Sequence, residues 1–110
     1  MVSNKANIEA KQINLTTPLH LASRNGNLSI VQYLLSNKAN IEAKQNKLLT
    51  PLHIASDSGF LPLVRFLVNQ KANIEAKSDN KLTPLDFAIA KGNTLVVQYL
   101  TAIQNKTKWN

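Results

Sequence analysis

The sequence lacks cysteine altogether. Without cysteine the chain forms neither disulfides nor thiolate metal sites, and it has no thiol nucleophile. No apolar run approaches the roughly 18–20 residues that a membrane-spanning helix needs, and no apolar segment of the secretory type follows Met1. Because disulfides mark oxidising compartments, these absences favour a reducing one, and we expect a cytoplasmic protein that binds no membrane.

Acidic residues are scarce as well. Six Asp and Glu residues face 13 Lys and Arg residues, which leaves a formal net charge of +7. Such a surplus suits an acidic partner or simply keeps a protein in solution, and charge alone does not choose between these roles. The 44% hydrophobic content is typical of globular proteins, and 110 residues suffice for one domain with a modest core.

Glycine and proline are few, and their positions are periodic. The three glycines, Gly26, Gly59 and Gly92, recur at an interval of 33 residues. Three of the four prolines recur at the same interval, each after a threonine, and the two histidines, His20 and His53, are also 33 residues apart. A fixed period of this length indicates a tandem repeat array.

The array fills a single domain, residues 1–110. It divides into units at residues 11–43, 44–76 and 77–110, preceded by a partial unit at residues 1–10. The partial unit is recognised by the segment NKANIEA at 4–10, which returns at 37–43 and, as QKANIEA, at 70–76. No linker separates the units.

Each unit predicts two short helices and an extended arm. Threonine is a good N-cap, the proline after it suits the first helical turn, and glycine about two turns later ends the helix. A second helix follows, with Leu and Val at helical spacing. Asn27 and Asn93 are suitable caps for this second helix, whereas Phe60 is a poor one. The Ala-Asn-Ile-Glu-Ala segment lacks helical periodicity and predicts an arm that returns to the next Thr-Pro.

A set of short motifs gives the units a family resemblance. The motifs are TPLHLA at 17–22, TPLHIA at 50–55, TPLDFA at 83–88, and ANIEA at 39–43 and 72–76. Their sequence, order and period resemble the ankyrin repeat over nearly the whole chain. Tetratricopeptide repeats lack the Thr-Pro cap at this place, and leucine-rich repeats are shorter. The resemblance implies an all-α solenoid, in which antiparallel helix pairs stack and β-hairpin-like fingers project from them.

The resemblance also implies a function. Ankyrin repeats usually bind other proteins through the concave surface of fingers and first helices, and the repeat itself is not catalytic. We therefore expect a non-enzymatic module that binds a partner protein, needs no cofactor and holds no metal. An acidic patch on the partner would suit the net charge. The alternative is an excised or engineered scaffold without a native partner.

Positions that differ between units and point outward are the candidates for recognition, and they match the variable surface of ankyrin repeats. The finger positions are Ile13, Asn14, Thr16, Asn46, Lys47, Leu49, Asp79, Asn80 and Leu82, and the first-helix ends are Arg24, Asn25, Asp57, Ser58, Ala90 and Lys91. The apolar members would form the desolvated centre of a binding strip and the charged helix ends its rim. Alternatively, Leu49 and Leu82 tuck against neighbouring fingers.

The remaining chemistry-bearing residues are explained by the repeat. His20 and His53 share one repeat position, where the family uses histidine for hydrogen bonds to the threonine and the backbone, and Asp86 replaces histidine there in the third unit. Glu42 and Glu75 recur beside lysines, which indicates a solvated charge ladder. No acid–base dyad, P-loop or nucleophile elbow is present.

Nucleic acid is a less favoured partner. A lysine column (Lys5, Lys38 and Lys71) would attract it by counterion release. However, Arg24 and Arg65 are the only arginines, and the aromatic residues of the second helices sit at core spacing, so surfaces for base stacking are missing.

The chain departs from the family pattern in its turns and at its ends. Lys38 and Lys71 stand where the family usually has glycine, and we predict positive φ at both, at a cost of about 1 kcal/mol each. Leu15, Leu48 and Lys81 occupy a second site where glycine is frequent. Polar residues such as Thr101 and Gln104 predict a wetter outer face for the third unit, as in a capping repeat. The outer apolar face of the first helix pair is expected to be exposed, which would allow end-to-end self-association.

Overall fold

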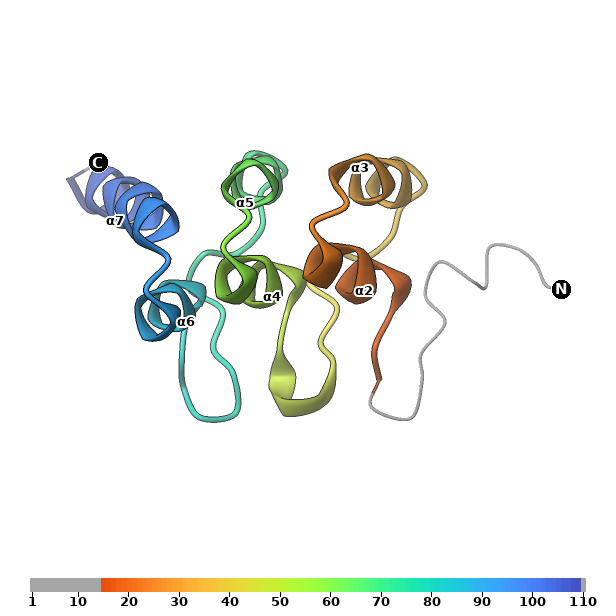
Figure 1. Cartoon of the computed structure of the whole chain (residues 1–110), viewed down its shortest axis with the longest axis horizontal. Coiled ribbons are helices and arrows are strands. Elements are labelled where there is room, and N and C mark those ends of the chain that lie inside the picture. The colour runs from red at the N-terminus through yellow and green to blue at the C-terminus, as the bar shows by residue number, and fades with distance from the viewer. Residues whose placement is uncertain (1–14, 110) are drawn as a thin grey trace, which may run out of the picture.

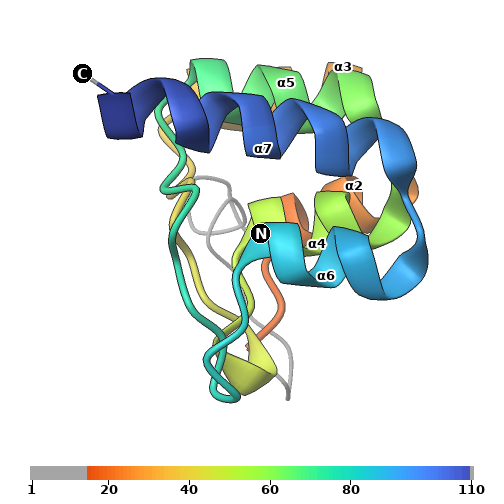
Figure 2. The same ribbon diagram turned by 90° about the vertical axis from the view of Figure 1, so that its left-hand side faces the viewer.

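The helices stand in two rows. The computed structural model describes residues 15–109, with side chains for residues 15–106. One row holds α2 (Pro18–Asn25), α4 (Pro51–Ser58) and α6 (Pro84–Lys91), and the other holds α3 (Leu28–Ser36), α5 (Leu61–Asn69) and α7 (Thr94–Trp109) (Figure 1). The loops between successive units project away from both rows (Figure 2). The elongated shape, 46 × 26 × 24 Å, fits an array whose units contact only their neighbours.

Capping boxes start the first helices. The hydroxyl of Thr17 accepts a hydrogen bond from the backbone N–H of His20 (3.3 Å), and Nδ1 of His20 accepts one from the N–H of Thr17 (3.0 Å). Thr50 and His53 form the same pair, and in the third unit Thr83 and Asp86 do. The predicted role of the Thr-Pro pairs is confirmed, since these bonds satisfy N–H groups that the first turn leaves without helical partners.

The second helices end in a tight reversal built on lysine. The N–H groups of Lys38 and Ala39 donate to the carbonyls of Leu35 and Leu34, both at 3.0 Å, which is the Schellman pattern. This pattern needs positive φ at its pivot, and the predicted left-handed conformation is confirmed at Lys38 (φ 71°) and Lys71 (φ 74°). Positive φ values also occur at Leu15, Leu48 and Lys81, the second site where the family often has glycine.

The fingers are hairpin-like turns. No strand occurs within residues 15–109, and one isolated antiparallel bridge joins Gln45 to Leu49 around a short 3₁₀ turn, Asn46–Leu48. The N–H of Ser78 donates to the carbonyl of Leu82 (2.9 Å), which closes the following finger at the same repeat position. Adjacent fingers are joined, because the N–H of Asp79 donates to the carbonyl of Lys47 (3.0 Å).

The core lies between the two rows and between successive units. Its fully buried side chains come from both rows and include Leu19, Leu52, Val31, Val64, Leu67, Val96 and Leu100. The first helices contact one another along the stack, where the small side chains of Ala55 and Ala88 are completely buried. None of the helices described here combines the length and apolar character required to cross a membrane.

The two ends of the stack expose apolar side chains. Leu21, Ile30 and Tyr33 are 38%, 46% and 65% exposed, whereas the second-unit equivalents of the first two, Ile54 and Leu63, are 4% and 1% exposed. The prediction of a bare apolar face on the first helix pair is therefore confirmed for these three side chains.

At the other end, Thr101 is exposed as expected for a wetter outer face. Ile89 is also exposed there, although the equivalent residues Ser23 and Ser56 are completely buried. The third unit thus replaces only part of its apolar outer face with polar residues.

Candidate functional site

The candidate recognition residues lie on the fingers and at the ends of the first helices. The exposed residues among them are Asn46, Lys47, Asp79 and Asn80 at the finger tips, Leu82 on the third finger, and Arg24, Asn25, Ala90 and Lys91 on α2 and α6; Leu49, Asp57 and Ser58 are half-buried. Ile13 and Asn14, like Lys5 and the partial unit at residues 1–10, lie outside the described residues. The surface made by these finger and helix-end residues is called the finger–helix surface below.

Thr16 is not part of this surface, contrary to the sequence-based prediction. Its side chain is 2% exposed, and its hydroxyl donates a hydrogen bond to Oε1 of Gln45 on the next finger (3.4 Å). A threonine directly before the N-cap points into the junction between the fingers, so variation between units at this position reflects packing.

Leu49 and Leu82 combine the two interpretations left open by the sequence. Leu82 is 39% exposed and adds an apolar patch beside the polar tips, whereas Leu49 is half-buried. The backbone of both residues is fixed, because Leu49 accepts a hydrogen bond from Nε2 of His20 (3.0 Å) and Leu82 accepts one from Nε2 of His53 (2.9 Å).

The two imidazoles hold the fold together. Nδ1 of His53 accepts from the N–H of Thr50 (3.1 Å), so Nε2 carries the proton that is donated to Leu82. The ring is completely buried, and its centroid lies 5.2 Å from that of the Phe87 ring in an edge-to-face arrangement. Burial is the main reason why the pKa of His53 lies below its ordinary value, and the ring is therefore neutral at pH 7. His20 and His53 thus bond to their own units and the next finger, in agreement with the structural role predicted for them.

The charge ladder is different from the one expected. Oε2 of Glu42 accepts a hydrogen bond from the backbone N–H of Asn73 in the next arm (2.7 Å). In residues 15–106 no ion pair joins Glu42 or Glu75 to a neighbouring lysine. The side chain of Glu42 thus links two stacked arms and does not pair with the lysine beside it, because stacking brings the backbone N–H of Asn73 within its reach.

A small cavity opens in the middle of the finger–helix surface. It has a volume of about 100 Å³ and is lined by Arg24, Leu49, His53, Ile54, Asp57, Ser58 and Phe87. These residues come from α2, the second finger, α4 and α6, so the cavity lies where the units meet and is called the junction cavity below. Four of its lining residues were predicted as recognition residues from the sequence.

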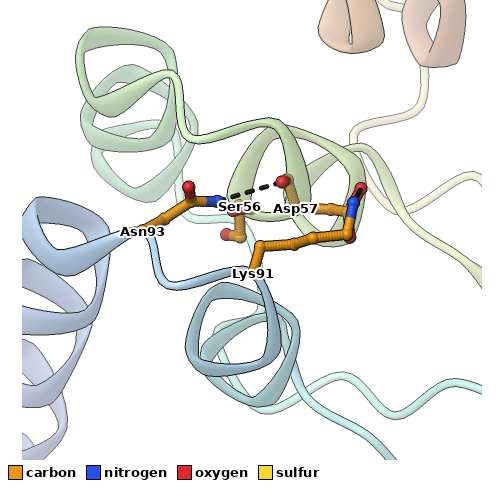
Figure 3. A network of polar contacts seen from close by, with 4 residues as sticks. All are labelled: Ser56, Asp57, Lys91 and Asn93. Atoms are coloured by element: carbon orange, nitrogen blue, oxygen red, sulfur yellow. Dashed lines mark hydrogen bonds and ion pairs between the residues drawn. The ribbon is translucent and has the colours of Figure 1, made fainter.

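An ion pair and an amide fix the rim of this cavity (Figure 3). Oδ2 of Asp57 lies 3.1 Å from Nζ of Lys91, which comes from the next unit. The side-chain amide of Asn93 donates to the carbonyls of Ser56 (2.8 Å) and Asp57 (3.0 Å) at the end of α4. Carbonyls in the last turn lack the full set of helical donors, and within the described residues that of Ser56 otherwise accepts only a long bond from the N–H of Gly59 (3.3 Å). Asn93 therefore stabilises the helix end and the junction together.

A family model of ankyrin repeats matches residues 1–45 and 19–109, with three copies. The chain belongs to the ankyrin repeat family. No curated protein matches it. Ankyrin repeats generally serve as protein–protein interaction modules and are typically non-enzymatic.

Three residues of this ankyrin site were missed in the sequence: His53, Ile54 and Phe87 all line the junction cavity. Helical spacing carries a signal for one of them. Ile54 precedes Asp57 and Ser58 by three and four residues, so the three side chains share a helix face. Phe87 occupies the position of Ile54 one unit later, and its contribution is visible only when neighbouring ankyrin units are stacked.

Proposed function

We propose that this ankyrin repeat chain binds a partner protein without catalysis, through the finger–helix surface. The proposal takes residues 1–110 as one domain with units at 11–43, 44–76 and 77–110, and it places the protein in the cytoplasm. The junction cavity carries the proposal, because it gives this surface a concave apolar centre within a polar rim.

The surface is also pre-organised for binding. The hydrogen bond from Asp79 to Lys47 joins the tips of two fingers, and the histidine bonds fix the finger bases on the helices. A surface that is ordered before contact loses less conformational entropy on association. The exposed tips therefore suit recognition of a folded or extended partner with little rearrangement.

Affinity capture with matched variants tests the proposal. Partners that bind the wild-type chain should be lost from the double variant Leu49→Ser/Leu82→Ser and retained by Leu95→Ser, which changes a 64% exposed leucine on α7. Circular dichroism shows whether each variant is folded. Partners retained by a folded Leu49→Ser/Leu82→Ser variant would place binding elsewhere, and a chain that captures nothing would favour the scaffold interpretation.

Screens for hydrolase and transferase activity should be negative, and turnover that depends on His20 would contradict the proposal.

The exposed face of the first unit supports a second proposal, that copies of the chain associate end to end. Leu21, Ile30 and Tyr33 are exposed, while the third-unit equivalents of Leu21 and Tyr33, which are Phe87 and Tyr99, contact His53 and Arg65 of the unit before. A second copy that docked its last unit here would repeat an interface that the chain already makes twice.

Sedimentation velocity over a wide concentration range tests this association. The mass of the wild-type chain should rise with concentration, and Ile30→Glu/Tyr33→Glu should stay monomeric, whereas Leu95→Glu should behave as the wild type. A monomeric wild-type chain at the highest concentration would rule out the association.

A further inference from the structure

We infer that the junction cavity takes one apolar side chain of the partner and that Arg24 pairs with a carboxylate beside that side chain. The ligand is therefore a peptide segment in which an aliphatic residue stands next to Asp or Glu. The inference rests on the proposed protein-binding function and names the partner's chemistry.

The size of the cavity selects this occupant. Pockets for cofactors and drug-sized molecules usually have volumes of about 300–1,000 Å³. The junction cavity has about 100 Å³, while a dry apolar cavity of about 150 Å³ accommodates benzene. One aliphatic side chain fits, and a whole cofactor does not.

Part of the cavity wall is apolar, and Arg24, Asp57 and Ser58 supply polar parts. Ile54 is 4% exposed, and Leu49 and Phe87 are half-buried around the same space. His53 contributes no free polar atom, because Nδ1 accepts from Thr50 and Nε2 donates to Leu82. Its ring thus acts as an apolar part of the wall, in edge-to-face contact with Phe87. An apolar side chain entering the cavity leaves no imidazole nitrogen without a partner.

The charge of the rim selects the neighbouring group. Asp57 is compensated by Lys91, at 3.1 Å. At the preceding junction, Arg24 is the repeat equivalent of Asp57, and Ser58 is the repeat equivalent of Lys91. Within residues 15–106 the guanidinium of Arg24 has no ion-pair partner, and the residue is exposed. Among the described residues that line the cavity, one cation therefore remains uncompensated. Guanidinium binds carboxylates through two parallel hydrogen bonds.

Peptide selection on the full chain tests the inference. A phage-displayed library of random peptides is selected in parallel on the wild-type chain and on Arg24→Glu. Wild-type selections should share an apolar residue within about two positions of Asp or Glu, and Arg24→Glu selections should carry Lys or Arg in place of the acid. A synthetic wild-type consensus peptide should bind Arg24→Glu roughly tenfold or more weakly by fluorescence polarisation, and its acid-to-lysine version should recover part of that affinity.

Two further variants separate the cavity from general charge. Arg65→Glu makes the same change at an exposed arginine of α5 and should leave the affinity within about twofold. Ser58→Phe places a ring at the wall of the cavity and should weaken binding as much as Arg24→Glu does. Thermal melts show that the variants compared are folded.

The outcomes distinguish a failure of this inference from a failure of the proposed protein-binding function. Peptides that bind more weakly to Leu49→Ser/Leu82→Ser but bind equally to wild type and Arg24→Glu would overturn the inference and leave the finger–helix surface in place. Selected peptides that are insensitive to all of these changes would overturn both. A library that yields no binder overturns the peptide inference, while affinity capture tests the function separately.

Discussion

Gly59 and Asn93 lie so close together that a Cβ atom on the glycine would stand 2.8 Å from Oδ1 of Asn93. The missing side chain allows Asn93 to reach the last carbonyls of α4. At the preceding junction a Cβ on Gly26 would stand 2.7 Å from the ring of Phe60, whereas one on Gly92 would meet no atom of the described residues within 4 Å. Glycine at this repeat position therefore serves both the left-handed turn and the packing of the next unit.

Alanine at these glycines should separate the two roles. Gly92→Ala is expected to lower the free energy of unfolding by about 1 kcal/mol, because only the left-handed conformation is penalised. Gly59→Ala should cost about 2–3 kcal/mol, because Asn93 must also move and lose hydrogen bonds. Urea unfolding of both variants measures the difference, and equal costs would show that the close approach is energetically unimportant.

Replacing a lysine by glycine should destabilise the protein less at a left-handed turn than at an ordinary backbone position. Lys38 has φ of 71°, while Lys44 is exposed like Lys38 and lies outside the left-handed region. Lys38→Gly and Lys44→Gly remove the same charge and add the same freedom to the unfolded chain, so the strain at Lys38 sets the difference. We expect Lys38→Gly to be about 1–2 kcal/mol more stable than Lys44→Gly in chemical denaturation. Two variants of equal stability would mean that the lysine turn is unstrained.

His53 should make the protein less stable in mildly acidic solution. Its pKa in the folded chain lies below the value of 6.5 expected when unfolded, mainly because of burial. The unfolded chain therefore binds more protons as the pH falls below about 6.5, and the free energy of unfolding decreases from there down to the folded pKa. An NMR titration of the imidazole should give a midpoint below 6.5, and a midpoint above that value would reverse the expected pH dependence.

The ion pair between Asp57 and Lys91 should contribute little to stability. Its side chains are 36% and 57% exposed, so solvent screens the attraction. A double-mutant cycle with Asp57→Asn and Lys91→Met should give a coupling free energy of about 0.5 kcal/mol or less, decreasing with added salt. A coupling well above 1 kcal/mol that is independent of salt would show that the pair is effectively shielded from solvent.

Local rules made the helices predictable from the sequence. Thr50 and Pro51 begin α4, and Gly59 follows its last residue, because capping and left-handed turns depend on a few consecutive residues. Asn27 caps α3 as expected, with its Oδ1 accepting from the N–H of Ile30 (3.4 Å), and Phe60 provides no side-chain cap.

Contacts between units were harder to predict. Thr16 varies between units like a surface residue, yet Gln45 of the next finger covers it. Asn93 was expected only as a cap, but its amide nitrogen crosses the junction to α4. Phe87 joins the junction cavity from a neighbouring helix. These contacts depend on the register and distance between stacked units, which the repeat period alone does not specify.

The histidine bonds also govern how the stack comes apart. Each Nε2 ties the start of one first helix to the finger that follows, at Leu49 for His20 and at Leu82 for His53. Nε2 of His20 also lies 2.9 Å from the carbonyl of Ala43. Releasing a finger therefore removes one of two carbonyl acceptors from a buried imidazole N–H, which raises the cost of opening one unit alone. Slow amide exchange should consequently concentrate in α4, which has a neighbour on both sides, and fraying should proceed inward from the ends.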